Sequence, residues 1–347
     1  MLAISLASSG GICLLLPLAP NALILGGLMG LLGIVQGASS PSSLAMIGCW
    51  YPNRERGMYV AIWNTSQNVG ASFLAFGASA LLSHTEYWQL VFWIPALLAF
   101  VCAWYVYTSS ADRPWQEGYP TLQEIYGRAG VPHSDVSRED SYWRLLWSAL
   151  TSTPVLWLLI VLNGLLYFVR FGVINWMPHF LANEKPFILS HANQTIAWLE
   201  IGAIPAVLFF AYLAYHFPAS MTTIGALSMF FLALALLFYQ GAMTENSLQW
   251  SALVIGAFVY APQVVVNVLT LNLIPQRMAG AAVGIVGLSG YLIGEVAANL
   301  VLPRIALIAD WQTSHTLLVL MTAVAGVVYA YLRPFEKRAV VLQNDEQ

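Results

Sequence analysis

Long apolar runs, separated by short polar breaks, make up most of this chain. A membrane-spanning helix needs about 20 apolar residues, so dividing the chain at prolines, asparagines and charged clusters predicts ten such helices. Four precede a polar gap: Met1–Leu18, Asn21–Trp50, Gly57–Ser83 and Trp88–Ser109. Six follow it: Pro154–Asn183, Gln194–His216, Thr222–Gly241, Leu248–Ile274, Ala279–Leu302 and Gln312–Leu332. The pattern therefore predicts an all-α protein that crosses a membrane several times.

The polar gap divides the predicted helices into two bundles. Its charged residues and its length are typical of a linker between bundles rather than of a loop within one. We therefore expect an incomplete four-helix bundle at residues 1–109, a cytoplasmic linker at 110–152, a six-helix bundle at 153–334 and a cytoplasmic tail at 335–347.

The basic residues in the loops predict the orientation. If the linker is cytoplasmic, alternating spans leave only Lys185 and Arg304 on the opposite side. The basic residues on the linker side are Arg54, Arg56, Arg113, Arg128, Arg138, Arg144, Arg277, Arg333, Lys337 and Arg338. Because Lys and Arg accumulate in cytoplasmic loops, both termini are predicted to be cytoplasmic.

The composition agrees with a membrane protein and excludes one class of function. Hydrophobic residues make up 59% of the chain, charged residues 8%, and the mean hydropathy is +0.70. Soluble domains carry about 25% charged residues. A net charge of -3 without a basic patch also offers no electrostatic footprint for nucleic acid.

No constellation of residues indicates catalysis. Cys13, Cys49 and Cys102 lie in apolar runs without metal-ligand spacing, so they are expected to be buried structural thiols. The histidines are scattered, without partners for nucleophilic or metal chemistry, and are expected at membrane interfaces. They are His84, His133, His179, His191, His216 and His315. The sequence also lacks a G-x-x-x-x-G-K loop for ATP, which predicts a non-enzyme that needs no cofactor.

Arg170 is the one Lys or Arg residue inside a membrane-length apolar run. Placing a guanidinium there costs roughly 2.5 to 3.5 kcal/mol on insertion scales. Such an arginine faces a partner carboxylate, a watery cavity or an anionic ligand. Asn163 and Tyr167 share its helix face, because the three residues are spaced by four and three positions. We expect this polar stripe to face inward.

Further polar stripes lie on other predicted spans. The span 248–274 carries Tyr260, Gln263, Asn267 and Thr270 at steps of three and four, and the span 57–83 carries Trp63, Asn64, Gln67 and Asn68. The span 21–50 carries Gln36, Ser39, Ser40 and Ser43. Exposed amides would lack partners in lipid, so these stripes either line a substrate path or make hydrogen bonds between helices. Among them, Asn64 and Gln67 are favoured as functional residues, whereas the serine stripe is more typical of close helix packing.

Glu200 and Glu295 are the two carboxylates inside predicted spans. Either one could neutralise Arg170 as a structural ion pair. Alternatively, one could hold Arg170 between substrates and release it when an anion arrives. A phosphate would take both branches of the guanidinium in bidentate geometry, which a lysine would not match.

A short repeat relates the two bundles. Residues 52–57 and 275–280 both read P-x-R-x-x-G, and both precede a glycine-rich helix. Parallel repeats of helical bundles are a known construction of transporters. Matching the two motifs leaves the first bundle without counterparts of two helices. This predicts a six-plus-six architecture that is reduced to four-plus-six in this chain.

Several segments resemble the organophosphate:phosphate antiporters of the major facilitator superfamily. Residues 167–181, YFVRFGVINWMPHFL, resemble the seventh-helix signature of that family, and residues 54–57 with 61–64 and 67–70 resemble its fifth-helix motif. Further similarity lies at Glu200 with Gly202, Ile204 and Pro205, at Tyr260 with Pro262, and at residues 279–282 leading into 290–292. The resemblance implies a two-bundle membrane fold and exchange of an organic phosphate for inorganic phosphate.

The resemblance also implies site residues. Arg170 matches the phosphate-binding arginine of the second half, and the cavity positions are matched by Tyr167, Tyr260, Tyr291, Asn64 and Glu200. Gln67 stands where glycerol-phosphate exchangers carry histidine, Asn175 where they carry aspartate, and Glu295 lies on the helix that resembles the discriminating one. The family further implies a monomer in a bacterial inner membrane.

Two alternatives stay open. Some members of the family sense a sugar phosphate for a signalling partner instead of transporting it, and the departures at Gln67 and Asn175 motivate that possibility. The missing helix pair motivates the other, a truncated or misassigned reading frame. A misassigned start predicts that the DNA upstream of Met1 encodes about 60 to 100 further residues with two apolar stretches, whereas absence of this extension would indicate an incomplete transporter.

Overall fold

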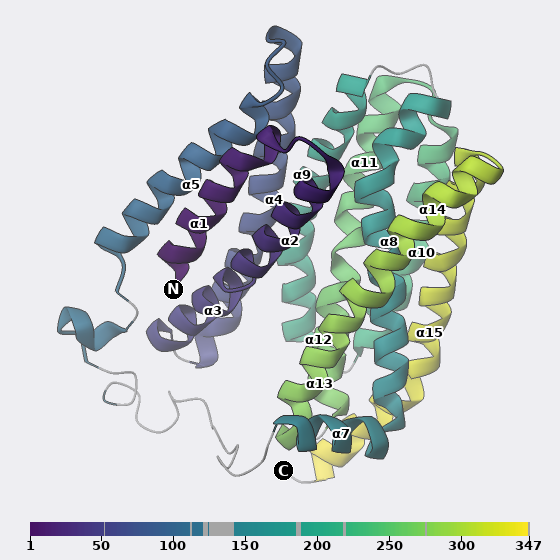
Figure 1. The fold of residues 1–347 in the computed structure, drawn as a ribbon. Helices are drawn as coiled ribbons and strands as arrows, with labels where there is room; N and C mark the ends of the chain where they lie inside the picture. Colours follow the sequence, from purple (N-terminus) through teal and green to yellow (C-terminus); the bar gives the residue numbers. More distant parts are fainter. Residues whose placement is uncertain are drawn as a thin grey trace. The chain divides into compact units, whose positions relative to one another are not determined.

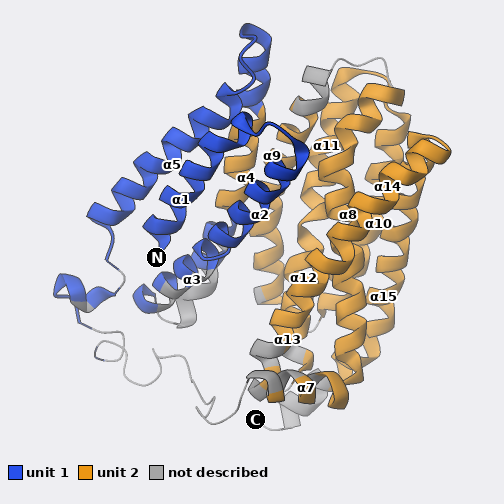
Figure 2. Cartoon of the chain, viewed as in Figure 1, with its two compact units in different colours: residues 1–64, 76–133 blue, residues 65–75, 134–347 orange. Residues whose placement is uncertain are grey.

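Helices form nearly all of the structure (Figure 1). The computed structural model describes residues 1–51, 53–111, 113–120, 124, 142–184, 189–217, 220–274 and 276–345, and these contain no strand. Two compact units are formed (Figure 2). Unit 1 comprises residues 1–64 and 76–133, and unit 2 comprises residues 65–75 and 134–347. The helix α4 (Asn53–His84) therefore contributes to both units.

Hydrogen bonds connect the apolar helices of unit 1. Its elements are α1 (Leu2–Leu15), η1 (Leu16–Leu18), α2 (Ala22–Gln36), α3 (Ser39–Trp50), the two ends of α4, α5 (Leu90–Ser109) and η2 (Pro114–Glu117). The hydroxyl of Ser5 donates to the carbonyl of Val35 at 2.8 Å, and the indole of Trp93 donates to the carbonyl of Leu14 at 3.2 Å. These bonds tie α1 to α2 and α5.

Unit 2 is arranged around α8. Its elements are α7 (Tyr142–Ser152), α8 (Pro154–Glu184), α9 (Leu189–His216), α10 (Met221–Gly241), α11 (Glu245–Val259), α12 (Ala261–Leu273), α13 (Gln276–Ser289), the π-helix η5 (Gly290–Glu295), α14 (Val296–Ile308) and α15 (Trp311–Asp345). Helix α8 packs against α9, α12, α13, α14 and α15. As a result, 67% of its apolar span is buried, against 33% to 56% for the other spans of this unit. A polar side chain on α8 therefore lies inside protein rather than in lipid.

The predicted all-α membrane fold is confirmed. Among the described residues, seven segments are long and apolar enough to cross a membrane. They are Leu90–Ser109, Pro154–Glu184, Gln194–Ala214, Met221–Gly241, Glu245–Thr270, Ala282–Ile308 and Trp311–Arg338. Shorter apolar helices at Leu2–Leu18 and Ala22–Gln36 correspond to the first predicted span and to part of the second.

Three predicted spans are not single α-helices. The span 21–50 is divided between α2 and α3, the span 248–274 between α11 and α12, and the span 279–302 contains the π-helix. A proline follows the first two breaks: Pro41 and Pro262 have no N–H for the carbonyls of Gly37 and Phe258. Helix α15 also continues through residues that were predicted as a tail.

Parts of the predicted organisation lie outside the described residues. Pro52 and Pro275, which begin the two repeat motifs, are among them, as are residues 121–123 and 125–141 of the predicted linker. The repeat and the linker therefore stay predictions.

The cysteines correct a prediction. All three are free thiols, but none is buried: Cys13 and Cys49 are half-buried and Cys102 is exposed. A thiol is apolar enough to face lipid, so a position in an apolar run does not require burial in the core.

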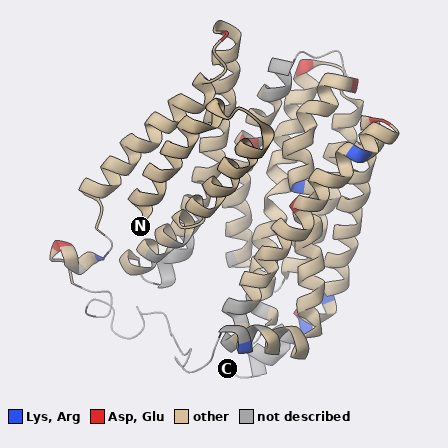
Figure 3. Ribbon diagram, viewed as in Figure 1, with Lys and Arg blue, Asp and Glu red and all other residues tan. Residues whose placement is uncertain are grey.

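Charged residues are few, and most of those described lie near helix ends (Figure 3).

Glu336 joins the far end of α15 to the start of α10. Its side chain is only 3% exposed, and its carboxylate accepts hydrogen bonds from the backbone N–H of Met221 at 2.6 Å and of Thr222 at 3.2 Å. The hydroxyl of Thr222 donates to it as well. A carboxylate at a helix N-terminus satisfies unpaired N–H groups and interacts favourably with the helix dipole. Glu336 therefore acts as the N-terminal cap of a distant helix.

Replacing Glu336 by glutamine is expected to destabilise unit 2. The amide keeps the size of the side chain but loses the charge and one acceptor, which should cost about 1 to 3 kcal/mol. The midpoint of thermal unfolding of the detergent-purified protein measures this loss. Glu86→Gln, at an exposed glutamate, is the control. Equal midpoints for both variants would show that the cap contributes nothing.

Candidate functional site

Helix α8 places Arg170 inside unit 2. Only 7% of its surface is exposed, and Asn163 and Tyr167 on the same helix face are buried too. The carbon Cζ of the guanidinium lies 4.3 Å from the ring centre of Tyr260, and Nη1 donates to Oε1 of Gln263 at 2.6 Å. The stripe on α8 therefore faces the interior, as its spacing predicts.

One donor of Arg170 is left without a partner. Its Nε–H is buried and makes no hydrogen bond in the described structure. The aromatic rings of Tyr167 and Phe171 lie 5.8 and 5.5 Å from Cζ, and such rings attract the cation without accepting a conventional hydrogen bond. An unsatisfied buried donor costs about 1 to 3 kcal/mol. A ligand with acceptor oxygens would remove this cost.

Glu200 of α9 lies behind Tyr260. Its carboxylate, 3% exposed, accepts a hydrogen bond from the hydroxyl of Tyr260 at 2.6 Å and another from Nδ2 of Asn68 at 2.8 Å. Asn68 belongs to the segment of α4 that is part of unit 2. The ring of Tyr260 thus faces the cation while its hydroxyl binds the anion. Two buried charges are connected through one aromatic side chain.

The position of Tyr260 follows from the break between α11 and α12. Pro262 leaves the carbonyl of Phe258 without its helical donor, so the helix is interrupted at Tyr260. The hydroxyl of Tyr329 in α15 donates to the carbonyl of Pro262 at 2.6 Å and holds the start of α12. The sequence motif Tyr-Ala-Pro therefore fixes the residue that contacts both charges.

The structure answers the question of an ion pair for Arg170 in part. Its guanidinium donates to the neutral amide of Gln263, and the carboxylate of Glu200 accepts hydrogen bonds from Tyr260 and Asn68. Within the described residues, Arg170 and Glu200 therefore do not form a direct hydrogen-bonded ion pair. Neither the structural ion pair nor the pair that would release Arg170 to a substrate is formed by Glu200 in this structure. Tyr260 separates the two groups.

The π-helix brings Tyr291 close to the site. The rings of Tyr291 and Tyr167 make an edge contact with centres 5.0 Å apart, and 52% of Tyr291 is exposed. Gly290 and Gly294 allow this approach, because a Cβ on Gly294 would lie only 2.6 Å from Cβ of Tyr167. Glu295, at the end of the π-helix, is half-buried. Tyr291 therefore lies at the open side of the aromatic group around Arg170.

Asn163 has a structural role. Its Nδ2 donates to the carbonyl of Val286 at 2.6 Å and so connects α8 with α13. This is the hydrogen bond between helices that the sequence left open as the alternative. Asn267 is exposed, and the hydroxyl of Thr270 donates to the carbonyl of Val266 in its own helix. Asn267 and Thr270, the last two residues of the polar stripe on α12, therefore do not belong to the group around Arg170.

Asn175 lies away from Arg170. It is exposed, and its Nδ2 donates to Oδ1 of Asn299 at 3.1 Å. The indole of Trp176 donates to the same oxygen at 3.1 Å. Asn299 therefore joins α14 to α8, and the structure gives Asn175 a role in this connection.

Asn64 and Gln67 are exposed, and Asn64 belongs to unit 1, whereas Gln67 belongs to unit 2. Of the polar stripe predicted on this helix, Asn68 is the buried residue, only 2% exposed.

Sequence reasoning placed Asn68 and Gln263 on polar stripes but did not select them as site residues, and it missed Asn299. The hydrophobic period could have supported Gln263, because it lies one turn from Tyr260. Helix α4 is polar on several sides, so its period could not decide between neighbours.

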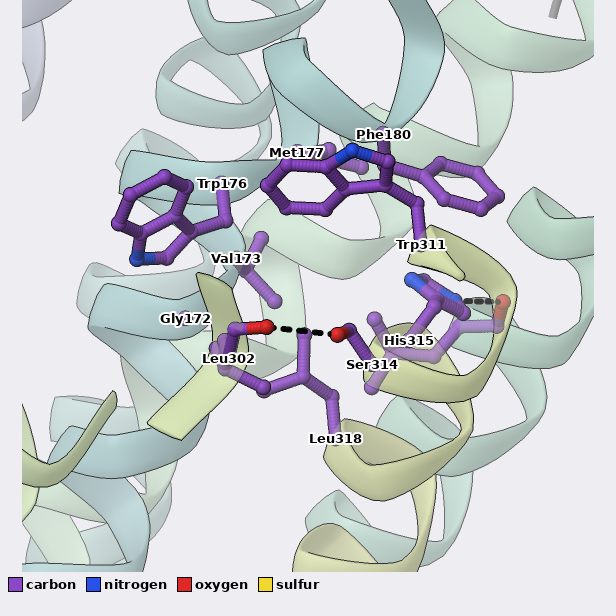
Figure 4. Close-up of a pocket in the computed structure, with 11 residues that line it drawn as sticks. Gly172, Val173, Trp176, Met177, Phe180, Leu302, Trp311, Ser314, His315 and Leu318 are labelled. Atoms are coloured by element: carbon purple, nitrogen blue, oxygen red, sulfur yellow. Dashed lines mark hydrogen bonds between the residues drawn. The ribbon is translucent and has the colours of Figure 1, made fainter. Parts of the chain in front are cut away.

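A small cavity lies between α8, α10, α14 and α15 (Figure 4). Its volume is about 20 Å³, which is room for one water molecule. His315 lines it, is only 5% exposed and has Nε2 at 2.9 Å from the carbonyl of Leu236. This histidine is therefore buried in protein, where its imidazole finds a carbonyl, and its predicted depth at the membrane interface stays a prediction. The cavity is too small for an organic ligand, so it is not a candidate for the binding site.

Comparison with known proteins identifies the family. The model of the Major Facilitator Superfamily matches residues 1–298. Among curated proteins, the phosphoglycerate transporter protein of Salmonella typhimurium is 28% identical over 271 residues, which cover 76% of this chain and 58% of that protein. The glycerol-3-phosphate transporter of Bacillus subtilis is 26% identical over 312 residues, covering 88% and 70%. The hexose-6-phosphate:phosphate antiporter of Escherichia coli is 27% identical over 281 residues, covering 79% and 60%.

These relatives confirm the resemblance to organophosphate:phosphate antiporters. The chain spans 58% to 70% of the length of the three relatives.

Solved structures agree on the fold. A bacterial homolog of the human lysosomal transporter Spinster matches with a TM-score of 0.59 at 16% identity, covering 97% of this chain and 82% of that one. The fucose:proton symporter FucP of E. coli matches with a TM-score of 0.61 at 14% identity, covering 95% and 83%. Together with the matched family model, the fold shows that this chain belongs to the Major Facilitator Superfamily.

Proposed function

We propose that this protein is a secondary transporter that exchanges an organic phosphate for inorganic phosphate by alternating access. The observation that carries the proposal is the state of Arg170: a buried cation whose Nε–H has no acceptor. A guanidinium matches the planar spacing of two oxygens on a phosphate, and the hydrogen bonds are charge-assisted. The names of the relatives at 26% to 28% identity support a phosphate ester as the ligand.

The surroundings of Arg170 favour an anion that arrives and leaves. A permanent carboxylate bonded to the guanidinium would compete with a ligand, whereas Gln263 is neutral and Glu200 is bonded through Tyr260. Aromatic rings at 4.3 to 5.8 Å stabilise the charge only weakly in comparison with an anion. The ligand would therefore find a cation that is stabilised but not neutralised.

The assignment of residues follows from this geometry. Arg170, Tyr167, Tyr260 and Tyr291 are proposed to contact the ligand, and Glu200 is proposed to position Tyr260. Glu295 keeps a proposed role in the substrate path, because its carboxylate interacts electrostatically with Arg170. For Asn64 and Gln67 the same role rests on the family resemblance alone. Asn175 is proposed only as a support of α8, because its amide is bonded to Asn299.

The wider setting is proposed as well. The bias of ten basic loop residues against two supports cytoplasmic termini in the inner membrane of a bacterium. We propose a monomer that acts without a cofactor and catalyses no chemical reaction.

Exchange in proteoliposomes tests the function. Vesicles with purified protein and internal phosphate should take up radiolabelled phosphate, and a sugar phosphate or glycerol phosphate outside should compete. Protein-free vesicles are the control. Uptake no faster than in the control would contradict exchange. Saturable binding of phosphate without uptake would instead support a sensor of the same fold.

A further inference from the structure

Gln263 connects the cation to a neighbouring hydroxyl. It lies on α12 one turn after Tyr260, and its side-chain oxygen accepts the hydrogen bond from Nη1 of Arg170 at 2.6 Å. The nitrogen of the same amide donates to the hydroxyl oxygen of Tyr167. One amide thus contacts two side chains of α8 that were assigned to the ligand.

Chemistry fixes the direction of both hydrogen bonds. A guanidinium has donors and no acceptor, so the amide atom next to Arg170 must be the oxygen. The amide nitrogen therefore faces Tyr167, whose oxygen must accept. A hydroxyl that accepts in this way still has its own hydrogen to donate to another acceptor. Gln263 therefore makes the hydroxyl of Tyr167 a donor, to the hydroxyl of Tyr291 with which it interacts or to an anion that takes that place.

The amide also selects the edge of the guanidinium that a ligand would meet. Gln263 occupies Nη1, which lies across the group from Nε. Nε and Nη2 share the remaining edge, and the Nε–H has no partner. An oxyanion binds such an edge with two parallel hydrogen bonds.

We propose that Gln263 is a positioning residue for phosphate recognition. Its amide turns the Nε–Nη2 edge of Arg170 and the hydroxyl of Tyr167 into one set of donors for a tetrahedral oxyanion. This inference rests on the proposed function. It adds the residue that determines which groups of the site donate hydrogen bonds to the ligand. An amide suits this task because it accepts from the cation and donates to the hydroxyl at the same time.

Two substitutions distinguish positioning from a purely structural role. Gln263→Glu keeps the shape but places an acceptor on both sides, so it should neutralise Arg170 and take the hydrogen of Tyr167. Affinity for inorganic phosphate should fall by about 100-fold. Gln263→Leu leaves the charge of Arg170 intact and removes only the hydrogen bonds that orient Arg170 and Tyr167. A loss of about 5-fold in phosphate affinity is therefore expected. If Gln263 served only packing and helix contacts, the leucine variant would be the weaker binder.

Titration of the full-length protein with inorganic phosphate at two pH values completes the test. Relative to wild type at the same pH, Gln263→Glu should recover affinity as the pH falls and the introduced carboxylate takes up a proton. Gln263→Leu should show no such recovery. The other charged and titratable side chains around the site are the same in every variant, so comparison with wild type at the same pH reports the introduced carboxylate. They are Arg170, Tyr167, Tyr260, Tyr291, Glu200 and Glu295. At neutral pH, the predicted order of affinity is wild type, then leucine, then glutamate.

The outcomes separate this inference from the proposed function. Wild-type protein that does not bind phosphate would overturn both. Wild-type binding would overturn the role of Gln263 alone in two cases: if the leucine variant is weaker than the glutamate variant at neutral pH, or if the affinity of the glutamate variant does not change with pH. Thermal unfolding of each variant, measured before titration, shows that the protein compared is folded.

Discussion

Arg170→Lys is expected to bind inorganic phosphate about 100-fold more weakly than the wild type, because a lysine cannot form the two parallel charge-assisted hydrogen bonds of a guanidinium. The positive charge persists, so the loss reports geometry rather than electrostatic attraction. A shorter reach from α8 would also remove the bond to Gln263 that Nη1 now makes at 2.6 Å. Equilibrium binding to the detergent-purified protein measures the affinity, and exchange in proteoliposomes should fall with it.

The matched control is Arg304→Lys, the same replacement at an exposed arginine of α14. It should bind and exchange phosphate like the wild type. If Arg170→Lys kept wild-type affinity, the guanidinium would not be the group that recognises the anion. If both variants lost affinity, the effect would be a general consequence of replacing arginine.

Gly256→Ala is expected to destabilise unit 2 by about 3 kcal/mol, which lowers its unfolding midpoint by about 10 °C. A Cβ at Gly256 would collide with the carbonyl oxygen of Leu199 and lie 2.6 Å from its carbonyl carbon. At the reciprocal contact, a Cβ at Gly202 would collide with the carbonyl oxygen of Leu253. Helices α9 and α11 therefore approach backbone to backbone, as small residues permit.

This packing also determines the site. Leu199 directly precedes Glu200, and Gly256 lies one turn before Tyr260. Separating α9 from α11 should therefore lengthen the 2.6 Å hydrogen bond between Glu200 and Tyr260 and weaken phosphate binding as well. Gly287→Ala is the control, because a Cβ there would meet nothing within 4 Å. Wild-type unfolding of Gly256→Ala would contradict the close approach.

The sequence predicted the features that depend on one helix alone. The apolar run around Arg170 and its spacing with Tyr167 predicted a buried polar stripe, because a charged group inside a span must face protein. The Tyr-Ala-Pro motif at 260–262 also contained a signal for the helix break, since proline cannot complete the helical bonding pattern, but the span 248–274 was predicted as one helix. Neither signal depends on a neighbouring helix.

The partners of Arg170 could not be predicted in the same way. A carboxylate was one of the partners that the sequence left open, yet the hydrogen bond is made by Gln263. The choice depends on how far α9 and α12 are rotated about their axes, and a rotation of one residue moves a side chain by about 100°. The same step separates Gln67, which is exposed, from Asn68, which binds Glu200.

Asn175 shows the limit of reasoning from family resemblance. The position matched a functional one, but it lies five residues after Arg170, about 140° around the helix. Its amide instead meets Asn299 of α14. A motif that is continuous in sequence can therefore serve both the site and the helix contacts around it.

The most direct test of the central claim is an experimental structure determined with inorganic phosphate. We predict density for a tetrahedral anion against the Nε–Nη2 edge of Arg170, within hydrogen-bond distance of the hydroxyl of Tyr167, with Gln263 still bonded to Nη1. Density for phosphate at another place, with the Nε–H of Arg170 still unpaired at saturating phosphate, would contradict the assignment of Arg170 as the anion-binding residue.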